Sequence, residues 1–346
     1  MKMTVRIVSV ACVALALAAC SGKSVLPAGG QGGASSYFSR PGVHGAGPSF
    51  TSVITDFSVA QKNSAPAGIV LGPDGNIWFA EHNKSSIIRM DPTTHKGARL
   101  VIGTKDSSPS QLVFDSSGNL WLTESLGNKI GEITSSGFIE YPLPTLKSDP
   151  TGITVGPDGN IWFTEFDNDR VASITPTGTI TEYHIPTAHS HPASITVGSD
   201  GALWFSENAS GKVGRVTTTG FFTEYELPDG SRPDGIALGA DGNIWVADGF
   251  MSFISQVTTG GVVTNYSTPT AAADPVGITA GPSGSNVLWF TEAGANNIAM
   301  ITTGGVITEF PVPTASSGVY RICVGPSNTL WFTEQAANKI GIESGS

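Results

Sequence analysis

The stretch GITVGPDGNIWFTE at residues 152–165 decides the fold, because versions of it recur along the whole chain. All seven Trp residues lie in such a copy, at intervals of 43, 41, 42, 41, 44 and 42 residues. The positions are Trp78, Trp121, Trp162, Trp204, Trp245, Trp289 and Trp331. A repeat of this length is typical of β-propellers and solenoids.

Each copy predicts four strands. An apolar run such as residues 152–155 reaches a turn at residues 158–160, whose Gly suits the positive φ of a tight hairpin. The Trp strand then returns, and a third strand such as residues 128–133 and an alternating fourth such as residues 179–185 follow. Four antiparallel strands per unit describe a propeller blade, so the chain is predicted to be an all-β, seven-bladed β-propeller.

The two ends of the repeat distinguish a closed ring from an open array. The last copy stops at residues 340–342 without a fourth strand, whereas residues 53–59 precede the first copy and resemble residues 306–312. We therefore expect the N-terminal strand to complete the last blade and close the ring. Closure would leave only short outer edges, which limits edge-to-edge aggregation.

Composition agrees with this fold class. The 346 residues include 43 Gly and 22 Pro, and only 13% are charged. Turn formers are too frequent for a helical bundle, and charges are too few for an acidic disordered chain or a coiled coil. Residues 51–346 are therefore predicted to form the propeller, which we expect to be a monomer.

The first residues are predicted to be a signal. Lys2 and Arg6 precede an apolar run at residues 7–19, which is shorter than the roughly 20 residues needed to span a bilayer. The small residues before Cys20 resemble a bacterial lipoprotein signal, which implies cleavage of residues 1–19 and lipidation of Cys20. The alternative is an ordinary signal peptide with a coincidental Cys. Ser21 at the next position favours the outer membrane if the cell is Gram-negative, so we expect an exported lipoprotein of the cell envelope, attached to the membrane through Cys20.

Residues 20–50 are predicted to be the lipidated Cys and a flexible tether, because residues 21–50 contain 8 Gly, 6 Ser and 3 Pro. Removal of residues 1–19 takes away two positive charges, so the formal net charge changes from −10 to −10 − 2 = −12. This charge disfavours binding to nucleic acid. Cys323 would be the remaining thiol besides Cys20; its apolar surroundings indicate a buried hydrophobic residue rather than a nucleophile.

An acidic residue lies three positions after every Trp, and strand direction places these residues on one face near the channel. They are Glu81, Glu124, Glu165, Glu207, Asp248, Glu292 and Glu334. Two interpretations compete, a cation or ligand site and a hydrogen-bonding device that ties neighbouring blades. Sevenfold recurrence favours the structural interpretation, because a catalytic site is asymmetric and needs each residue once.

Function is therefore expected where the repeat varies. The residues at the start of the first strands differ between copies and provide polar side chains on the same face. The predicted binding face consists of Asp149, His191, Arg232, Asp234, Asp274 and Tyr320. Ordinary solvated loop residues are the alternative interpretation. The pattern His189-Ser190-His191 lacks a third ligand at a fixed spacing, so the residues alone indicate no metal site and no cofactor.

The repeat resembles that of the virginiamycin B lyase family, which consists of seven-bladed propellers that linearise streptogramins. The resemblance covers residues 51–342 and rests on residues 152–165, on the Asn-Lys-Ile-Gly runs at 128–131 and 338–341, and on the Ile-Thr-Glu-aromatic runs at 180–183 and 307–310. More distantly, the chain resembles NHL-repeat and gluconolactonase-type propellers. The resemblance implies elimination chemistry in which Mg²⁺ polarises the substrate and a His acts as the base.

The same resemblance locates the expected site residues. It places the family's base His at Tyr320, a substrate-contacting His at Val276, a Glu at Gly318, and an acidic residue at Glu334. Tyr320 and Glu334 are therefore the catalytic candidates, and Mg²⁺ is the implied cofactor. No first strand in any copy begins with Pro-His, so shifting the comparison by whole blades supplies no base.

Three functions follow from these observations. The first is a lipid-anchored propeller that binds a small molecule, a glycan or a protein at the channel mouth. The second is a metal-assisted enzyme of lyase or lactonase type with relocated catalytic groups. The third is a structural protein of the envelope.

Overall fold

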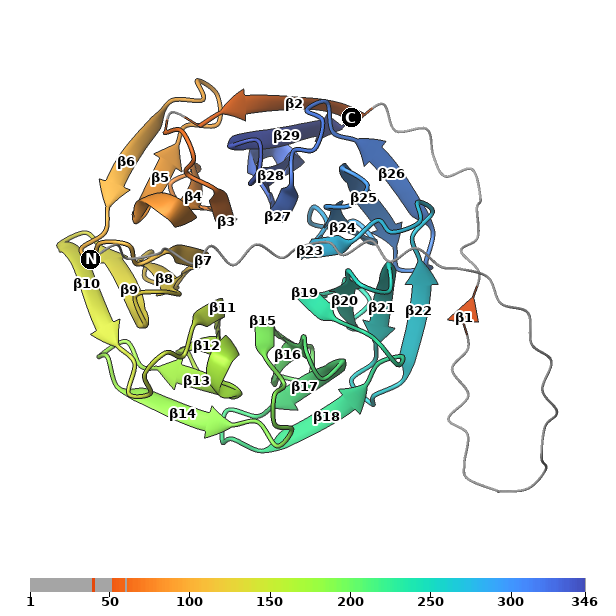
Figure 1. Cartoon of the computed structure of the whole chain (residues 1–346), viewed down its shortest axis with the longest axis horizontal. Coiled ribbons are helices and arrows are strands. Elements are labelled where there is room, and N and C mark those ends of the chain that lie inside the picture. Colours follow the sequence, from red (N-terminus) through yellow and green to blue (C-terminus); the bar gives the residue numbers. More distant parts are fainter. Residues whose placement is uncertain (1–38, 41–51, 60, 346) are drawn as a thin grey trace, which may run out of the picture. The chain divides into compact units, whose positions relative to one another are not determined.

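The computed structural model describes residues 39–40, 52–59 and 61–345. Within these ranges the strands form seven sheets that succeed one another around a ring (Figure 1). The predicted seven-bladed propeller is confirmed. The predicted signal, Cys20 and nearly all of the tether lie outside the described residues. In the described part of the chain, no helix has the length and apolar character needed to cross a membrane.

The blades are numbered 1 to 7 in chain order from β3. Blades 1 to 6 each have four consecutive antiparallel strands, whereas blade 7 combines the last three strands with β2, which precedes blade 1. Their bounds are β3 (Pro66–Leu71), β4 (Ile77–Glu81), β5 (Ser86–Met90) and β6 (Gly97–Val101); β7 (Pro109–Phe114), β8 (Leu120–Glu124), β9 (Lys129–Thr134) and β10 (Gly137–Pro142); β11 (Pro150–Val155), β12 (Ile161–Glu165), β13 (Arg170–Ile174) and β14 (Ile180–His184); β15 (Pro192–Val197), β16 (Leu203–Glu207), β17 (Lys212–Val216) and β18 (Phe222–Glu226); β19 (Pro233–Leu238), β20 (Ile244–Asp248), β21 (Phe253–Val257) and β22 (Val263–Ser267); β23 (Pro275–Ala280), β24 (Val287–Glu292), β25 (Asn297–Thr302) and β26 (Ile307–Pro311); and β27 (Val319–Val324), β28 (Leu330–Glu334) and β29 (Lys339–Gly345). Short 3₁₀ helices occur at His82–Lys84, Phe166–Asn168 and Pro326–Asn328, and a two-residue strand β1 (Ser39–Arg40) pairs in parallel with β22.

The N-terminal strand closes the ring as predicted. Strand β2 (Ser52–Ser58) pairs antiparallel with β29, in a register that runs from Ser52 opposite Gly345 to Ser58 opposite Lys339. It thereby supplies the outermost strand of blade 7 (Figure 1). The Lys339 ammonium adds an ion pair with Asp56, with 2.8 Å between Nζ and Oδ1.

The Trp side chains form the core between blades. Five of them are at most 1% exposed, and Trp78 and Trp289 are 9% and 8% exposed. Trp162 of blade 3 packs in one cluster with Ile195 and Phe205 of blade 4. Its indole N–H donates to Asp158 Oδ1 at 3.0 Å in the preceding turn. The Trp strand therefore fixes both the contact with the next blade and the turn of its own hairpin.

Hydroxyl groups in the Trp strands join neighbouring blades. The innermost strand of every blade has a register shift close to its start. The backbone N–H at the third residue of that strand therefore needs an acceptor other than the neighbouring strand. In blade 3 the Thr164 hydroxyl accepts from Gly152 N at 2.8 Å and donates to Ala193 O of blade 4 at 3.0 Å. Ser206 and Thr291 repeat this bridge, donating to the carbonyls of Asp234 and Tyr320. One hydroxyl thus accepts from the free N–H of the bulged strand and donates to a carbonyl of the neighbouring blade.

Replacing Trp162 with Ala tests the packing between blades. We expect a loss of about 3–5 kcal/mol in the free energy of unfolding, because the large cavity left by the indole removes contacts with blade 4. Urea unfolding followed by far-ultraviolet circular dichroism measures this loss. Trp121→Ala and Trp204→Ala test equivalent positions, and the packing account fails if all three variants unfold at the parent's urea concentration.

Candidate functional site

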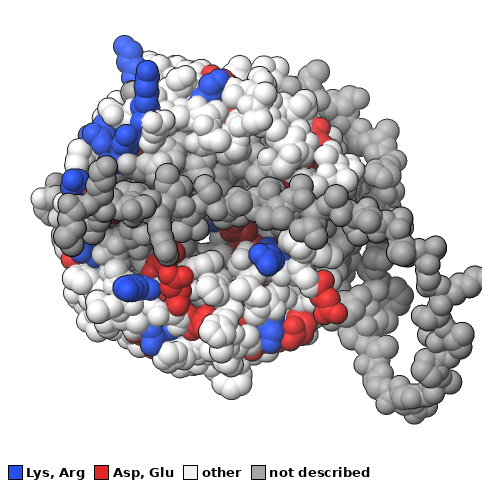
Figure 2. Space-filling model, in the orientation of Figure 1, with Lys and Arg blue, Asp and Glu red and all other residues white. Residues whose placement is uncertain are grey.

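The candidate site lies at the mouth of the central channel. The first strands of the blades, namely β3, β7, β11, β15, β19, β23 and β27, are innermost in the ring (Figure 1). The loops that lead into these strands and the ends of the Trp strands share one face. Figure 2 shows acidic and basic side chains close to the opening on the viewed face.

Arg321 is at the centre of the site. Its Nη2 donates to Asp234 Oδ1 at 3.0 Å and to the Tyr320 hydroxyl oxygen at 3.4 Å, and its guanidinium carbon lies 4.6 Å from the centroid of the Tyr320 ring. The Arg321 and Asp234 side chains are 13% and 26% exposed. Because Arg321 belongs to blade 7 and Asp234 to blade 5, the ion pair joins two blades that are not adjacent in the ring.

Tyr320 is held in its protonated form. The Arg321 charge acts to lower the pKa of Tyr320, but burial and the charges of Asp234 and Asp149 outweigh it, so the pKa is raised above the ordinary value. The phenol therefore remains a neutral hydroxyl at neutral pH. A general base must be able to take a proton near the working pH, and this Tyr cannot do so.

Asp149 and His82 interact electrostatically in the same mouth. Burial, followed by the charge of Asp167, raises the pKa of Asp149, while Ser125 and His82 act in the opposite sense. Burial lowers the pKa of His82, whose Nδ1 donates to Pro109 O of blade 2 at 3.2 Å. His82 is thus neutral at neutral pH and serves as a bridge between blades 1 and 2.

Asp274 is the third acidic residue of the mouth, beside Asp234 and Asp149. Burial and then the nearby Asp234 charge raise the pKa of Asp274. The structure gives neither Asp149 nor Asp274 an ion pair among the residues it describes. The mouth therefore combines one satisfied ion pair, Arg321 with Asp234, and two carboxylates that carry unpaired charge.

Four of the six residues predicted for the binding face interact with one another, and two do not. Asp149, Asp234, Asp274 and Tyr320 influence one another's charge. His191 instead packs edge-on against Phe166, with ring centroids 4.8 Å apart. Arg232 is exposed and stacks on Phe250 at 5.3 Å from the ring centroid.

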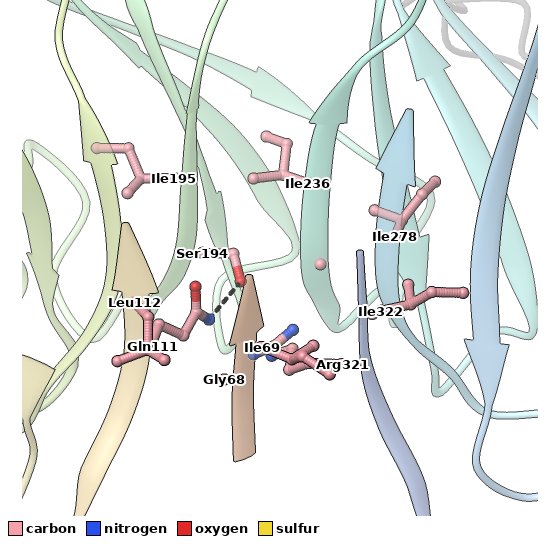
Figure 3. Close-up of a pocket in the computed structure, with 12 residues that line it drawn as sticks. Gly68, Ile69, Gln111, Leu112, Ser194, Ile195, Ile236, Ile278, Arg321 and Ile322 are labelled. Atoms are coloured by element: carbon pink, nitrogen blue, oxygen red, sulfur yellow. Dashed lines mark hydrogen bonds between the residues drawn. The ribbon is translucent and has the colours of Figure 1, made fainter. Parts of the chain in front are cut away.

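Sequence reasoning missed the residues that line the channel itself. A small cavity of about 110 Å³ is lined by Gln111, Ser194 and Arg321 together with Gly and Ile residues of the first strands. In Figure 3 these three polar side chains point into the same space, and Gln111 Nε2 donates to Ser194 Oγ at 3.4 Å. Gly68, Gly152, Gly235 and Gly277 occupy the equivalent position in the other blades. A comparison of the repeat copies one residue further along the first strand would have singled out Gln111, Ser194 and Arg321.

The acidic residues that follow the Trp strands are all fully buried. Glu81 accepts from Ser86 Oγ at 2.6 Å, Glu207 from Ser210 Oγ at 2.9 Å and Glu292 from Asn297 Nδ2 at 3.0 Å. These bonds stay inside one blade, so the ties between blades that we expected of the carboxyls are formed by the Trp-strand hydroxyls instead. Burial raises the pKa to about 7 for Glu124, Glu165 and Glu334 and to about 8 for Glu207 and Glu292.

The residues do not fit the Mg²⁺ that the family resemblance implies. Across the described ranges, no group of three or more His, Cys, Asp or Glu side chains is arranged to hold a metal ion. Gly318 has no side chain to offer, and burial raises the pKa of Glu334 to about 7. A hard cation prefers several ionised oxygen ligands, and one buried carboxyl that retains a proton near neutrality does not supply them.

Comparison with known proteins supports the same fold. The family model described as "Virginiamycin B lyase family" matches residues 52–267 and 229–345. A crystal structure of virginiamycin B lyase from Staphylococcus aureus is 37% identical, with a TM-score of 0.81 over 85% of this chain and 99% of that one. A streptogramin B lyase structure is 38% identical, with a TM-score of 0.81 over 85% and 98%. Comparison with curated proteins gives no match.

A third similar structure is a catalytically inactive His-to-Ala variant of the S. aureus lyase with quinupristin. It is 37% identical to this chain, with a TM-score of 0.81 over 85% of this chain and 99% of that one.

The buried carboxyls predict how stability depends on pH. The pKa of Glu207 is about 8 in the folded chain against an ordinary value of 4.5, so the folded state binds this proton more tightly than the unfolded state. Its stabilising contribution is complete below about pH 4.5 and is lost as the pH rises through about 8. We expect the Tm of Glu207→Gln to fall less than that of the parent between about pH 5 and pH 9.

Asp106→Asn is the control, because Asp106 is exposed and is not among the groups that influence Glu207. It should follow the parent's curve of Tm against pH. Parallel curves for the parent and Glu207→Gln would contradict the raised pKa.

Proposed function

Because the chain belongs to the virginiamycin B lyase family, we propose that it is a ligand-binding member of that family, which recognises a small, positively charged polar molecule at the channel mouth. The observation that carries the proposal is the contact of Arg321 with Asp234 and Tyr320. It occupies the place where the resemblance implies a catalytic base.

Two features argue against streptogramin linearisation. Tyr320 and Val276 stand where the resemblance implies His residues, and the pKa of Tyr320 is raised rather than lowered. The inactive His-to-Ala variant of the S. aureus lyase is consistent with the need for a His in that protein. This chain has no His at either position and has Gly318 where the resemblance implies a Glu, so it lacks residues for both parts of the chemistry that the family resemblance implies.

The charges of the mouth favour a cation. Arg321 neutralises Asp234, which leaves Asp149 and Asp274 as negative groups, and His82 is neutral because burial lowers its pKa. Clefts lined by charges of one sign raise the local concentration of ligands with the opposite sign. Gln111 and Ser194, deeper in the channel, add hydrogen-bonding groups that suit a polar molecule.

The alternative is a metal-assisted lyase or lactonase with relocated catalytic groups. The 37–38% identity to lyases along nearly their whole length favours this alternative. It predicts activity that is lost on chelation and in Glu334→Gln or Tyr320→Phe.

Incubation with quinupristin and Mg²⁺ separates the two functions. Chromatography is the measurement, because ring opening by elimination conserves mass. We expect the cyclic compound to remain intact at times when a lyase control converts it completely. A linear product that disappears on chelation would overturn the binding proposal in favour of the enzyme.

Binding is tested with putrescine as a probe, by calorimetry at low ionic strength, since salt screens exposed charges. We expect Asp149→Asn and Asp274→Asn each to weaken binding by roughly tenfold, in line with the loss of a charged hydrogen bond. Asp91→Asn is the matched control, because Asp91 lies in a hairpin turn at the other end of the strands. Equal dissociation constants for the parent and both mouth variants would refute a cation site.

We also propose that the chain is exported and anchored to the membrane of the cell envelope by lipid on Cys20. Support comes from Lys2, Arg6, the apolar residues 7–19 and the small residues before the Cys. Attachment by more than one acyl chain is needed for stable anchoring.

Metabolic labelling with radioactive palmitate tests the anchor. The full-length chain should incorporate label and sediment with membranes, and Cys20→Ser should do neither. Cys323→Ser is the control, since that thiol is half-buried and desolvation raises its pKa to about 12. Label retained in Cys20→Ser would contradict lipidation at this residue.

A further inference from the structure

One Trp in the repeat has lost the hydrogen bond that the others make. The indole N–H groups of Trp78, Trp121, Trp162, Trp204, Trp245 and Trp331 donate to a residue of the preceding turn. The structure shows no acceptor for Trp289 Nε1 among the residues it describes, and this nitrogen is not one of the buried atoms that lack a partner, so it is accessible although the side chain as a whole is only 8% exposed. An accessible N–H on a mostly buried ring is free to donate to a bound ligand.

The turn before Trp289 explains the missing bond. It is two residues longer than in the other blades and has no Asp at the position that Asp158 occupies in blade 3. Its polar groups instead bond to one another, since Ser285 N and Oγ both donate to Pro282 O, at 3.0 and 2.6 Å. The insertion therefore withdraws the acceptor from the indole.

A cavity of about 360 Å³ lies at this indole, between blades 6 and 7. Trp289, Val287, Met300 and Leu330 contribute to its walls, and Glu343 and Asn328 also line it. It is formed by the hairpin turns between first and second strands, whereas the channel mouth is formed by the loops before the first strands. The cavity is therefore on the opposite face from the proposed cation site.

We propose that this cavity is a second ligand site, which takes a flat, neutral, mostly apolar molecule with one carbonyl-type acceptor. Its volume is within the range of small-molecule sites, and apolar walls with one placed polar group are typical of them. The acceptor of the ligand would receive the Trp289 N–H.

The probe for this site is 6-propionyl-2-(dimethylamino)naphthalene, a flat neutral ketone whose emission shifts to the blue in apolar surroundings. We expect saturable binding with a blue shift in the full chain. Trp289→Phe keeps an aromatic ring but removes the N–H, and should raise the Kd about tenfold, as expected for loss of one hydrogen bond in a buried site.

Trp78→Phe is the matched control. Trp78 is 9% exposed, close to the value for Trp289, but its N–H is already used by Asp74. It should leave the Kd for the ketone unchanged. Val287→Trp fills the cavity and should abolish binding, and thermal unfolding of each variant confirms that it is folded.

Two results would overturn the site. One is an absence of saturable binding to the parent, and the other is the same Kd in the parent, Trp289→Phe and Val287→Trp, which would mean adsorption elsewhere on the chain. Trp289→Phe should also leave the putrescine titration unchanged, so this site stands or falls independently of the channel mouth.

Discussion

The pairing of β2 with β29 is the constraint on which the rest of the structure depends. The cores of a propeller lie between neighbouring blades, so a ring that is left open at one joint loses the packing there and the fixed angle between its ends. Here the joint is made within one blade by strands from both ends of the described propeller, reinforced by the ion pair of Lys339 with Asp56. Closure in this way places blades 5 and 7 around a common channel, where Asp234 meets Arg321.

The repeated residues serve mainly to hydrogen-bond backbone N–H and C=O groups and to fill the core. Trp side chains pack across each joint, and hydroxyls such as that of Thr164 bond to a bulged strand and to the next blade at once. These roles need the same residue in most blades. The binding functions that we propose use the exceptions, namely Arg321 where four blades have Gly, and Trp289 where six blades give the indole an acceptor.

Periodicity was enough to predict the blade count, the strand order and the closing strand, because each depends on spacing and on patterns of apolar residues. Side-chain partners were harder to predict. The buried acids were expected to bridge blades, yet Glu207 and Glu292 bond inside their own, since backbone direction does not determine where a flexible carboxyl finds a donor. Arg321 was overlooked because a basic residue at the start of a strand is ordinary until the ring brings Asp234 opposite it. The longer turn without Asp before Trp289 can be seen in the sequence, but only the structure reveals the cavity beside the indole.

The most direct test of this account joins the two ends of the chain. Thr55 lies opposite Ile342 in the β2–β29 register, so cysteines introduced at both positions are close enough to form a disulfide. With Cys323 replaced by Ser, mild oxidation of the double variant should give one intramolecular disulfide between residues 55 and 342, identified by peptide mass mapping, with a raised Tm. A chain in which these two cysteines remain reduced, while the protein is folded, would contradict closure of the ring by the N-terminal strand.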